Sequence, residues 1–173
     1  MHRREVALIV DPGRPYDRHI VRGVAAFVEE QHRHWSLYVE EGPVARLPDL
    51  KAWGGAGIIA NFDDRRIATA VRRTSAPIVG VGGGYGYYPG DPDIPYVRTD
   101  NRAIAELAAN HLFDMGLRRF AFCGEPPNRA NGWARERAEA FVSAIEAAGC
   151  ECDVYNGRHS PSRRWRESQT QLQ

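Results

Sequence analysis

Short apolar runs alternate with segments of helical periodicity along most of the chain, and this alternation constrains the fold more than any other feature. The first run, Val6–Val10, is apolar at every position, which is typical of a strand covered by helices on both faces of a parallel sheet. Strands that alternate with helices favour βαβ units with right-handed crossovers. The sequence therefore predicts an α/β fold with a doubly wound parallel sheet. Strands are expected at Glu5–Val10, Trp35–Glu40, Gly57–Ala60, Pro77–Val81, Tyr96–Thr99, Phe120–Cys123 and Cys152–Tyr155.

Helices are expected between these strands, because apolar residues there recur every three or four positions. On the first helix such residues form a single face, which predicts that this face is buried. It consists of Tyr16, Ile20, Val24, Phe27 and Val28. The predicted helices cover residues 16–31, 47–53, 64–73, 101–115 and 133–148.

The segment Thr99–Gly124 carries the clearest local signals of the second half. Asp100 is a preferred N-cap residue, able to accept a hydrogen bond from the first turn of the following helix. Gly116 stands where that helix is expected to end in a left-handed conformation. The predicted apolar face of this helix consists of Ile104, Leu107, Ala108, His111, Leu112 and Met115.

The character of the chain changes at Gly157. The last 17 residues, GRHSPSRRWRESQTQLQ, contain two large apolar residues, Trp165 and Leu172, and show no regular period. Segments of this composition cannot bury enough apolar surface to fold by themselves. We expect a disordered or non-native tail over residues 157–173.

Polar and aromatic residues gather where the predicted strands end, which is where parallel sheets bind their ligands. Arg137 precedes Phe141 by one turn on an apolar stripe, and a charge there cannot enter the core cheaply. It is therefore expected to face a ligand, with Trp133 one turn earlier offering a ring for stacking. The candidate ligand-binding residues are Tyr16, Asp17, Arg18, Asn61, Asp63, Asp100, Trp133, Glu136 and Arg137.

Each candidate also has a purely structural explanation. Charges in the first turn of a helix interact with its dipole. A role as N-cap of the following helix accounts for one aspartate of the pair Asp63-Asp64. Glu136 can form an exposed ion pair with an arginine, an interaction that contributes little stability.

The sequence offers no constellation for catalysis or for a bound cofactor. The run Gly80–Tyr85 lacks the third glycine and the following helix of a dinucleotide fingerprint. No phosphate-binding loop and no cluster of serine, histidine and acid around a strained turn is found. The three cysteines match no zinc spacing. We therefore expect no enzyme activity, no cofactor and no metal.

The overall charge and the start of the chain bear on its surroundings. A formal net charge of +1 indicates no broad attraction to nucleic acid or membrane. The apolar run Val6–Val10 is too short for a signal peptide or a membrane span. A cytoplasmic location is expected.

Several motifs resemble one known family. The Asp100-Asn101 pair and Leu112-x-x-x-Gly116 are similar to the start of the second lobe in sensor domains of the lactose/galactose-repressor type. A closer resemblance, spread over residues 4–148, is to the sensor half of the bacterial xylose operon regulators. It rests on Tyr16-Asp17-Arg18, Trp35–Glu41, Gly57–Asp64, Ala76–Gly83, Thr99–Asn101, Arg119–Phe122 and Trp133-Ala-x-Glu-Arg137.

This resemblance implies a periplasmic-binding-protein-like fold of type I, with a complete first lobe over residues 1–99 and a truncated second lobe over 100–156. It implies a sugar effector, D-xylose, bound between the lobes, a homodimer, and DNA binding only through a helix-turn-helix domain missing from this chain. Asn61 departs from the family, where an acidic residue is usual, so the sugar can differ. A periplasmic-type sugar-binding protein and a small α/β sugar-processing enzyme remain the alternatives.

Overall fold

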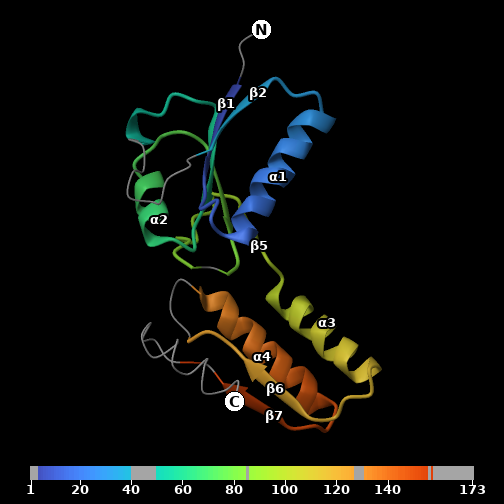
Figure 1. The fold of residues 1–173 in the computed structure, drawn as a ribbon. Helices are drawn as coiled ribbons and strands as arrows, with labels where there is room; N and C mark the ends of the chain where they lie inside the picture. Colours follow the sequence, from blue (N-terminus) through green and yellow to red (C-terminus); the bar gives the residue numbers. More distant parts are fainter. Residues whose placement is uncertain (1–3, 40–49, 85, 127–130, 156, 158–173) are drawn as a thin grey trace. The chain divides into compact units, whose positions relative to one another are not determined.

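A computed structural model describes residues 4–39, 50–84, 86–126, 131–155 and 157. The chain forms two compact units, Met1–Arg98 and Thr99–Gln173, each of which is described by itself (Figure 1). Three of the predicted segments fall partly outside the described residues, namely residue 40 of the second strand, residues 47–49 of the short second helix and residues 158–173 of the tail.

The first unit is a five-stranded sheet in which every pair of neighbouring strands is parallel. The strand order is β2-β1-β3-β4-β5, and Figure 1 shows α1 and α2 on opposite faces of this sheet. The predicted doubly wound arrangement is confirmed. The elements are β1 (Arg4–Ile9), α1 (Pro15–Glu30), β2 (Trp35–Val39), a short 3₁₀ helix (Leu50–Ala52), β3 (Gly57–Asn61), α2 (Arg65–Val71), β4 (Ile78–Gly82) and β5 (Tyr96–Arg98).

The order of the strands decides which loops meet. The chain turns to one side of β1 to form β2 and to the other side to form β3. The loops that follow β1 and β3 therefore leave neighbouring strands at the same edge of the sheet. Such a switch point is the usual ligand-binding place in open α/β sheets.

The core of the first unit lies between the sheet and α2. Phe62, at 0% exposure, is the largest of its side chains and meets the rings of Tyr88 and Tyr96 edge to face. Although Phe62 directly follows β3 at the carboxyl edge of the sheet, its ring is fully buried and presents no face to a ligand. The buried core residues are Ala7, Ile9, Leu50, Ile58, Ala60, Phe62, Ile67, Ala68 and Val71.

The predicted buried face of α1 needs one correction. Phe27 is 47% exposed and lies at the end of the helix beside the ring of Trp35, with 6.2 Å between the ring centroids. Ile20, Val24 and Val28 are half-buried, and the buried residue of this helix is Asp17. Helical periodicity identified the face but not the depth of each position.

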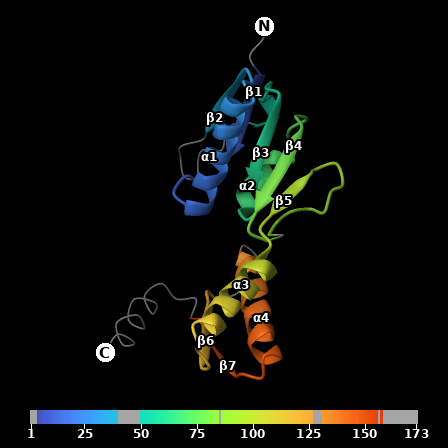
Figure 2. The same ribbon diagram turned by 90° about the vertical axis from the view of Figure 1, so that its right-hand side faces the viewer.

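The second unit contains α3 (Asn101–Asp114), β6 (Phe120–Cys123), α4 (Gly132–Ala147) and β7 (Cys152–Tyr155). The strands β6 and β7 pair in parallel, α4 packs on both of them, and α3 packs against α4 (Figure 2). Gly116 and Gly149, which follow the two helices, have φ angles of +80° and +75°. The predicted left-handed glycine at the end of α3 is confirmed, and Gly149 ends α4 in the same way.

The predicted apolar face of α3 is wrong. Leu107 is 72% exposed and Met115 is 65% exposed, whereas Ala105 and Ala109 are buried together with Asn101. Small residues allow α3 to approach α4 closely, so the buried stripe follows the alanines rather than the larger side chains.

In the part of the chain that the structure describes, no helix is long and apolar enough to cross a membrane.

Candidate functional site

Three of the candidate residues form a buried polar network at the switch point of the first unit. Asp17, Asn61 and Asp63 are 1%, 2% and 5% exposed. Asn61 Nδ2 donates to Asp17 Oδ1 over 2.7 Å, and Asn61 Oδ1 accepts from the backbone N–H of Asp63 over 2.8 Å. Asp17 Oδ2 accepts from the backbone N–H of Asp11 over 2.7 Å. The network therefore links the end of β1, the first turn of α1 and the end of β3.

Asp63 extends this network to β4. Its Oδ2 accepts from the backbone N–H of Gly83 over 2.7 Å, which fixes the loop that leaves β4. Burial raises the pKa of Asp63, and the backbone N–H of Gly83 opposes this shift. Burial also raises the pKa of Asp17, against the hydrogen bonds from Asp11 and Asn61. Both carboxyl groups are thus costly to ionise and are held by donors that favour ionisation.

Tyr16 and Arg18 flank Asp17 on α1 and bind backbone oxygens of neighbouring loops. Tyr16 Oη donates to the carbonyl of Gly82 over 2.9 Å. Arg18 Nη1 donates to the carbonyls of Pro12 and Gly13, each over 2.9 Å. Both side chains therefore brace the loops at the carboxyl edge of the sheet.

The alternative explanation of the Asp63-Asp64 pair holds for Asp64. Asp64 is the N-cap of α2, and its Oδ1 accepts from the backbone N–H of Arg66 over 2.7 Å. Hydrogen bonds and charge from Arg66 lower the pKa of Asp64 even though its partial burial acts in the opposite direction. The pair thus divides into a half-buried cap and a buried member of the network.

A second cluster of candidates lies in the second unit, on the first turns of α4. The guanidinium of Arg137 lies over the ring of Trp133, with 4.9 Å between its central carbon and the ring centroid. Its Nε donates to Asn101 Oδ1 over 2.9 Å, and Asn101 Nδ2 donates to Glu136 Oε2 over 2.8 Å. Trp133, Glu136 and Arg137 are half-buried, and together they present a ring, an acceptor and a cationic donor.

Asp100 acts as a helix cap in the structure. It is the N-cap of α3, and its Oδ1 accepts from the backbone N–H of Ala103 over 2.9 Å. The predicted cap is confirmed. A capping carboxylate keeps a second oxygen, so this contact does not exhaust its capacity to accept hydrogen bonds.

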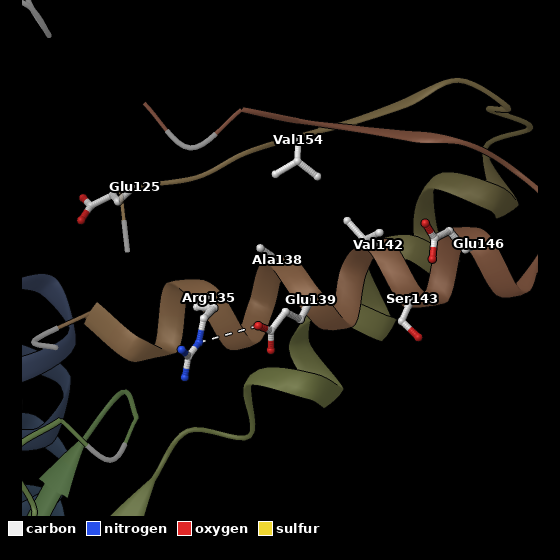
Figure 3. Close-up of a pocket in the computed structure, with 8 residues that line it drawn as sticks. All are labelled: Glu125, Arg135, Ala138, Glu139, Val142, Ser143, Glu146 and Val154. Atoms are coloured by element: carbon white, nitrogen blue, oxygen red, sulfur yellow. Dashed lines mark ion pairs between the residues drawn. The ribbon is translucent and has the colours of Figure 1, made fainter. Parts of the chain in front are cut away.

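A pocket in the second unit lies apart from these residues (Figure 3). It opens between α4 and β7, on a face of α4 other than the one that carries Arg137. Arg135 and Glu139 form an ion pair of 3.7 Å at its edge. Its lining residues are Glu125, Arg135, Ala138, Glu139, Val142, Ser143, Glu146 and Val154.

Metal chemistry has no support in the described segments, where no group of three or more His, Cys, Asp or Glu side chains could hold an ion. What the two clusters offer is hydrogen bonding from carboxylates, amides and a guanidinium, beside aromatic rings. Groups of this kind recognise hydroxyl-rich ligands with an apolar face.

Sequence reasoning missed the role of Asn101. It is 1% exposed and holds both Glu136 and Arg137. A spacing of four residues with Ala105 and Ala109 places Asn101 on the buried stripe of α3. That spacing was the available signal, but the larger residues of the helix obscured it.

Comparisons with known proteins agree with this architecture. The XylR N-terminal domain family matches residues 5–102, and the periplasmic binding protein-like domain family matches residues 109–173. The second match includes the segment that the sequence analysis expects to be a disordered or non-native tail.

Curated relatives from two genera are named xylose operon regulatory protein. The one from Escherichia coli K12 is 36% identical over 170 residues, which is 98% of this chain and 43% of the relative. The one from Haemophilus influenzae Rd is 32% identical over 168 residues, which is 97% of this chain and 43% of the relative. The chain thus spans less than half the length of both.

Solved structures show the same fold. The structure of the xylose-binding transcription activator xylR matches with a TM-score of 0.81 and 34% identity, over 99% of this chain and 43% of the other. A periplasmic binding protein/LacI transcriptional regulator from Alkaliphilus metalliredigens, complexed with D-xylulofuranose, matches with a TM-score of 0.63 and 17% identity, over 91% and 57% of the two chains. The expected periplasmic-binding-protein-like fold is confirmed.

Proposed function

Because the chain belongs to the XylR N-terminal domain family, we propose that it is the effector-sensing part of a bacterial transcription regulator and that its effector is D-xylose. Proteins similar to it are named xylose operon regulatory protein and xylose-binding transcription activator. Since the chain spans 43% of these relatives, reading of DNA is assigned to a helix-turn-helix domain outside it.

The observation that carries this proposal is the pairing of Arg137 with Trp133 on α4. A pentose presents hydroxyl groups at its rim and C–H bonds on its faces. Trp133 offers an aromatic face for the C–H bonds, and the Arg137 guanidinium offers several donors in a fixed plane for the hydroxyl groups. Glu136 adds an acceptor beside them.

The first unit contributes Tyr16, Asp17, Arg18, Asn61 and Asp63 to the proposed sugar site, and Asp100 belongs to the second. The buried members of the network order the strand ends and the first turn of α1, which carries Tyr16 and Arg18. Asp17 accepts two hydrogen bonds, and in the described part of the chain Asp63 Oδ1 is buried without a partner. A carboxylate has room for more than two such bonds, which leaves Asp17 and Asp63 competent to bind hydroxyls.

Sensing requires that the sugar favour one conformation of the regulator. A ligand shifts such an equilibrium only by the difference between its affinities for the two states. We propose that the protein acts as a homodimer in the cytoplasm and that binding of the sugar changes the affinity of this homodimer for DNA. No catalytic step is proposed, because neither cluster provides a nucleophile with an adjacent base.

Titration calorimetry on the longest protein product of the gene tests the proposal, with D-xylose and with a hexose such as D-galactose. We expect binding of D-xylose, a much weaker response to the hexose, and no consumption of either sugar. Replacing Arg137 by Ala is expected to weaken xylose binding by about 10- to 100-fold, the value of a hydrogen bond to a charged group.

Arg135→Ala is the matched control. Arg135 lies on the same helix but is exposed and paired with Glu139, so its removal should leave xylose affinity within about twofold. Absence of xylose binding to the wild-type protein, or equal effects of the two substitutions, would contradict the proposed function.

A further inference from the structure

The first residue of α3 is a buried polar residue on an otherwise apolar stripe. Asn101 is 1% exposed and lies on the same face as Ala105 and Ala109. Burying an amide is costly unless its polar atoms find partners. The start of the helix does not explain its presence, because Asp100 already caps α3.

The two ends of the Asn101 amide meet two different residues of α4. Its Oδ1 accepts from Arg137 Nε over 2.9 Å, and its Nδ2 donates to Glu136 Oε2 over 2.8 Å. A guanidinium only donates and a carboxylate only accepts, so the amide fits in one orientation. A neutral amide suits this position because its oxygen can accept from Arg137 while its nitrogen donates to Glu136.

The contact with Asn101 fixes the plane of the Arg137 guanidinium. The guanidinium is rigid and planar, so holding its Nε at Asn101 and its face over Trp133 at 4.9 Å determines where both Nη groups lie. Within the described residues, neither Nη group of Arg137 has a recorded hydrogen bond. They remain available to a ligand.

We propose that Asn101 is a positioning residue of the sugar site, which holds the Arg137 guanidinium in its ligand-binding orientation. Asn101 itself does not contact the sugar. The part of this inference that concerns sugar rests on the proposed function, whereas the part that concerns the orientation of Arg137 does not.

A double-mutant cycle in the longest product of the gene tests the inference through xylose affinity. Asn101→Leu keeps the volume and removes both hydrogen bonds, and we expect about a tenfold loss of affinity. In an Arg137→Ala background the same substitution should cost less than about twofold, because it acts through Arg137. Additive losses in the two backgrounds would overturn the inference, since they would mean that Asn101 acts independently.

Asn101→Asp is the conservative variant. It keeps the acceptor for Arg137 but sets a carboxylate against that of Glu136, so it should recover part of the affinity that Asn101→Leu loses. Arg102→Ala is the matched control on the neighbouring position, because Arg102 is exposed and paired with Glu106. It should leave the affinity unchanged, and thermal unfolding verifies that each variant is folded.

The arginine Nε–H resonances in ¹⁵N NMR spectra of the sugar-free protein decide the orientation by themselves. We expect the Arg137 Nε proton to exchange slowly with water in the wild type and in Asn101→Asp, and rapidly in Asn101→Leu. Rapid exchange in the folded wild type would overturn the inference. If the wild type binds no pentose, the proposed function fails, and this measurement still decides the role of Asn101.

Discussion

Asn61 and Asp17 stand 44 positions apart in the chain, yet Asn61 Nδ2 donates to Asp17 Oδ1 over 2.7 Å and both side chains are buried. This hydrogen bond ties the end of β3 to the first turn of α1. The strand order, which places β1 beside β3, brings the two residues together. Residues that the sequence suggests as ligand contacts therefore also hold the edge of the sheet.

Asn61→Leu should destabilise the protein by about 2–4 kcal/mol, because it leaves Asp17 Oδ1 and the backbone N–H of Asp63 buried without partners. Urea unfolding followed by circular dichroism measures the change. Thr69→Ala is the control, since it removes an exposed hydrogen bond to the carbonyl of Arg65 and should cost less than about 0.5 kcal/mol. Equal effects would mean that the buried network contributes no stability.

The pKa values of Asp17 and Asp63, both raised by burial, predict a pH dependence of stability. A raised pKa in the folded state means that the folded protein binds protons more tightly than the unfolded chain. The contribution of these groups to the free energy of unfolding therefore increases as the pH falls through their raised pKa values in the folded state. It is fully present below 3.8, the ordinary pKa of the group.

Asp63→Asn isolates this effect, because asparagine does not titrate. We expect the stability of the wild type relative to Asp63→Asn to rise as the pH is lowered, measured by urea unfolding at several pH values. A difference that stays constant, or that falls with decreasing pH, would show that burial does not raise the pKa of Asp63.

Gly80→Ala should destabilise the first unit by about 1–3 kcal/mol through overpacking. A Cβ atom at this position would lie 2.6 Å from the ring of Tyr96 and 2.9 Å from that of Phe62. Gly23→Ala in α1 is the opposite case, because nothing lies within 4 Å of the added atom, and it should stabilise the helix by up to about 1 kcal/mol. Thermal unfolding of both variants checks the pair; a neutral Gly80→Ala would contradict the packing described.

Asp100 is predicted to serve both as a cap and as a ligand contact, and two substitutions separate these roles. Asp100→Ala removes the cap and should cost about 1 kcal/mol of stability. Asp100→Asn keeps a capping oxygen, so its stability should match the wild type. If Asp100 also binds sugar through its charge, both variants lose xylose affinity in calorimetry; retention of affinity in both would assign Asp100 to the cap alone.

Local patterns were sufficient for the fold. The apolar run Val6–Val10 and the helical periods around it predicted the alternation of strands and helices that the structure contains. The glycines at 116 and 149 marked the helix ends, because a left-handed residue is required at that point regardless of the rest of the chain. Such features depend on residues close in sequence, so they can be predicted without knowing which distant segments are in contact.

The depth of burial was not determined in this way. Leu107 and Met115 are exposed while Ala105 and Ala109 are buried, because the spacing between two packed helices, and not the size of a side chain, selects the buried stripe. Likewise Phe62 lies in the core, edge to face with the rings of Tyr88 and Tyr96, although it directly follows the end of a strand.

By itself the sequence determined the class of fold, the ends of the helices and the region where polar residues gather, since each follows from local periodicity and backbone preference. The tertiary structure alone decided that Asn61 binds Asp17 and that Asn101 binds Arg137. These pairs join residues 44 and 36 positions apart, and such contacts form only once strand order and helix packing have brought distant segments together.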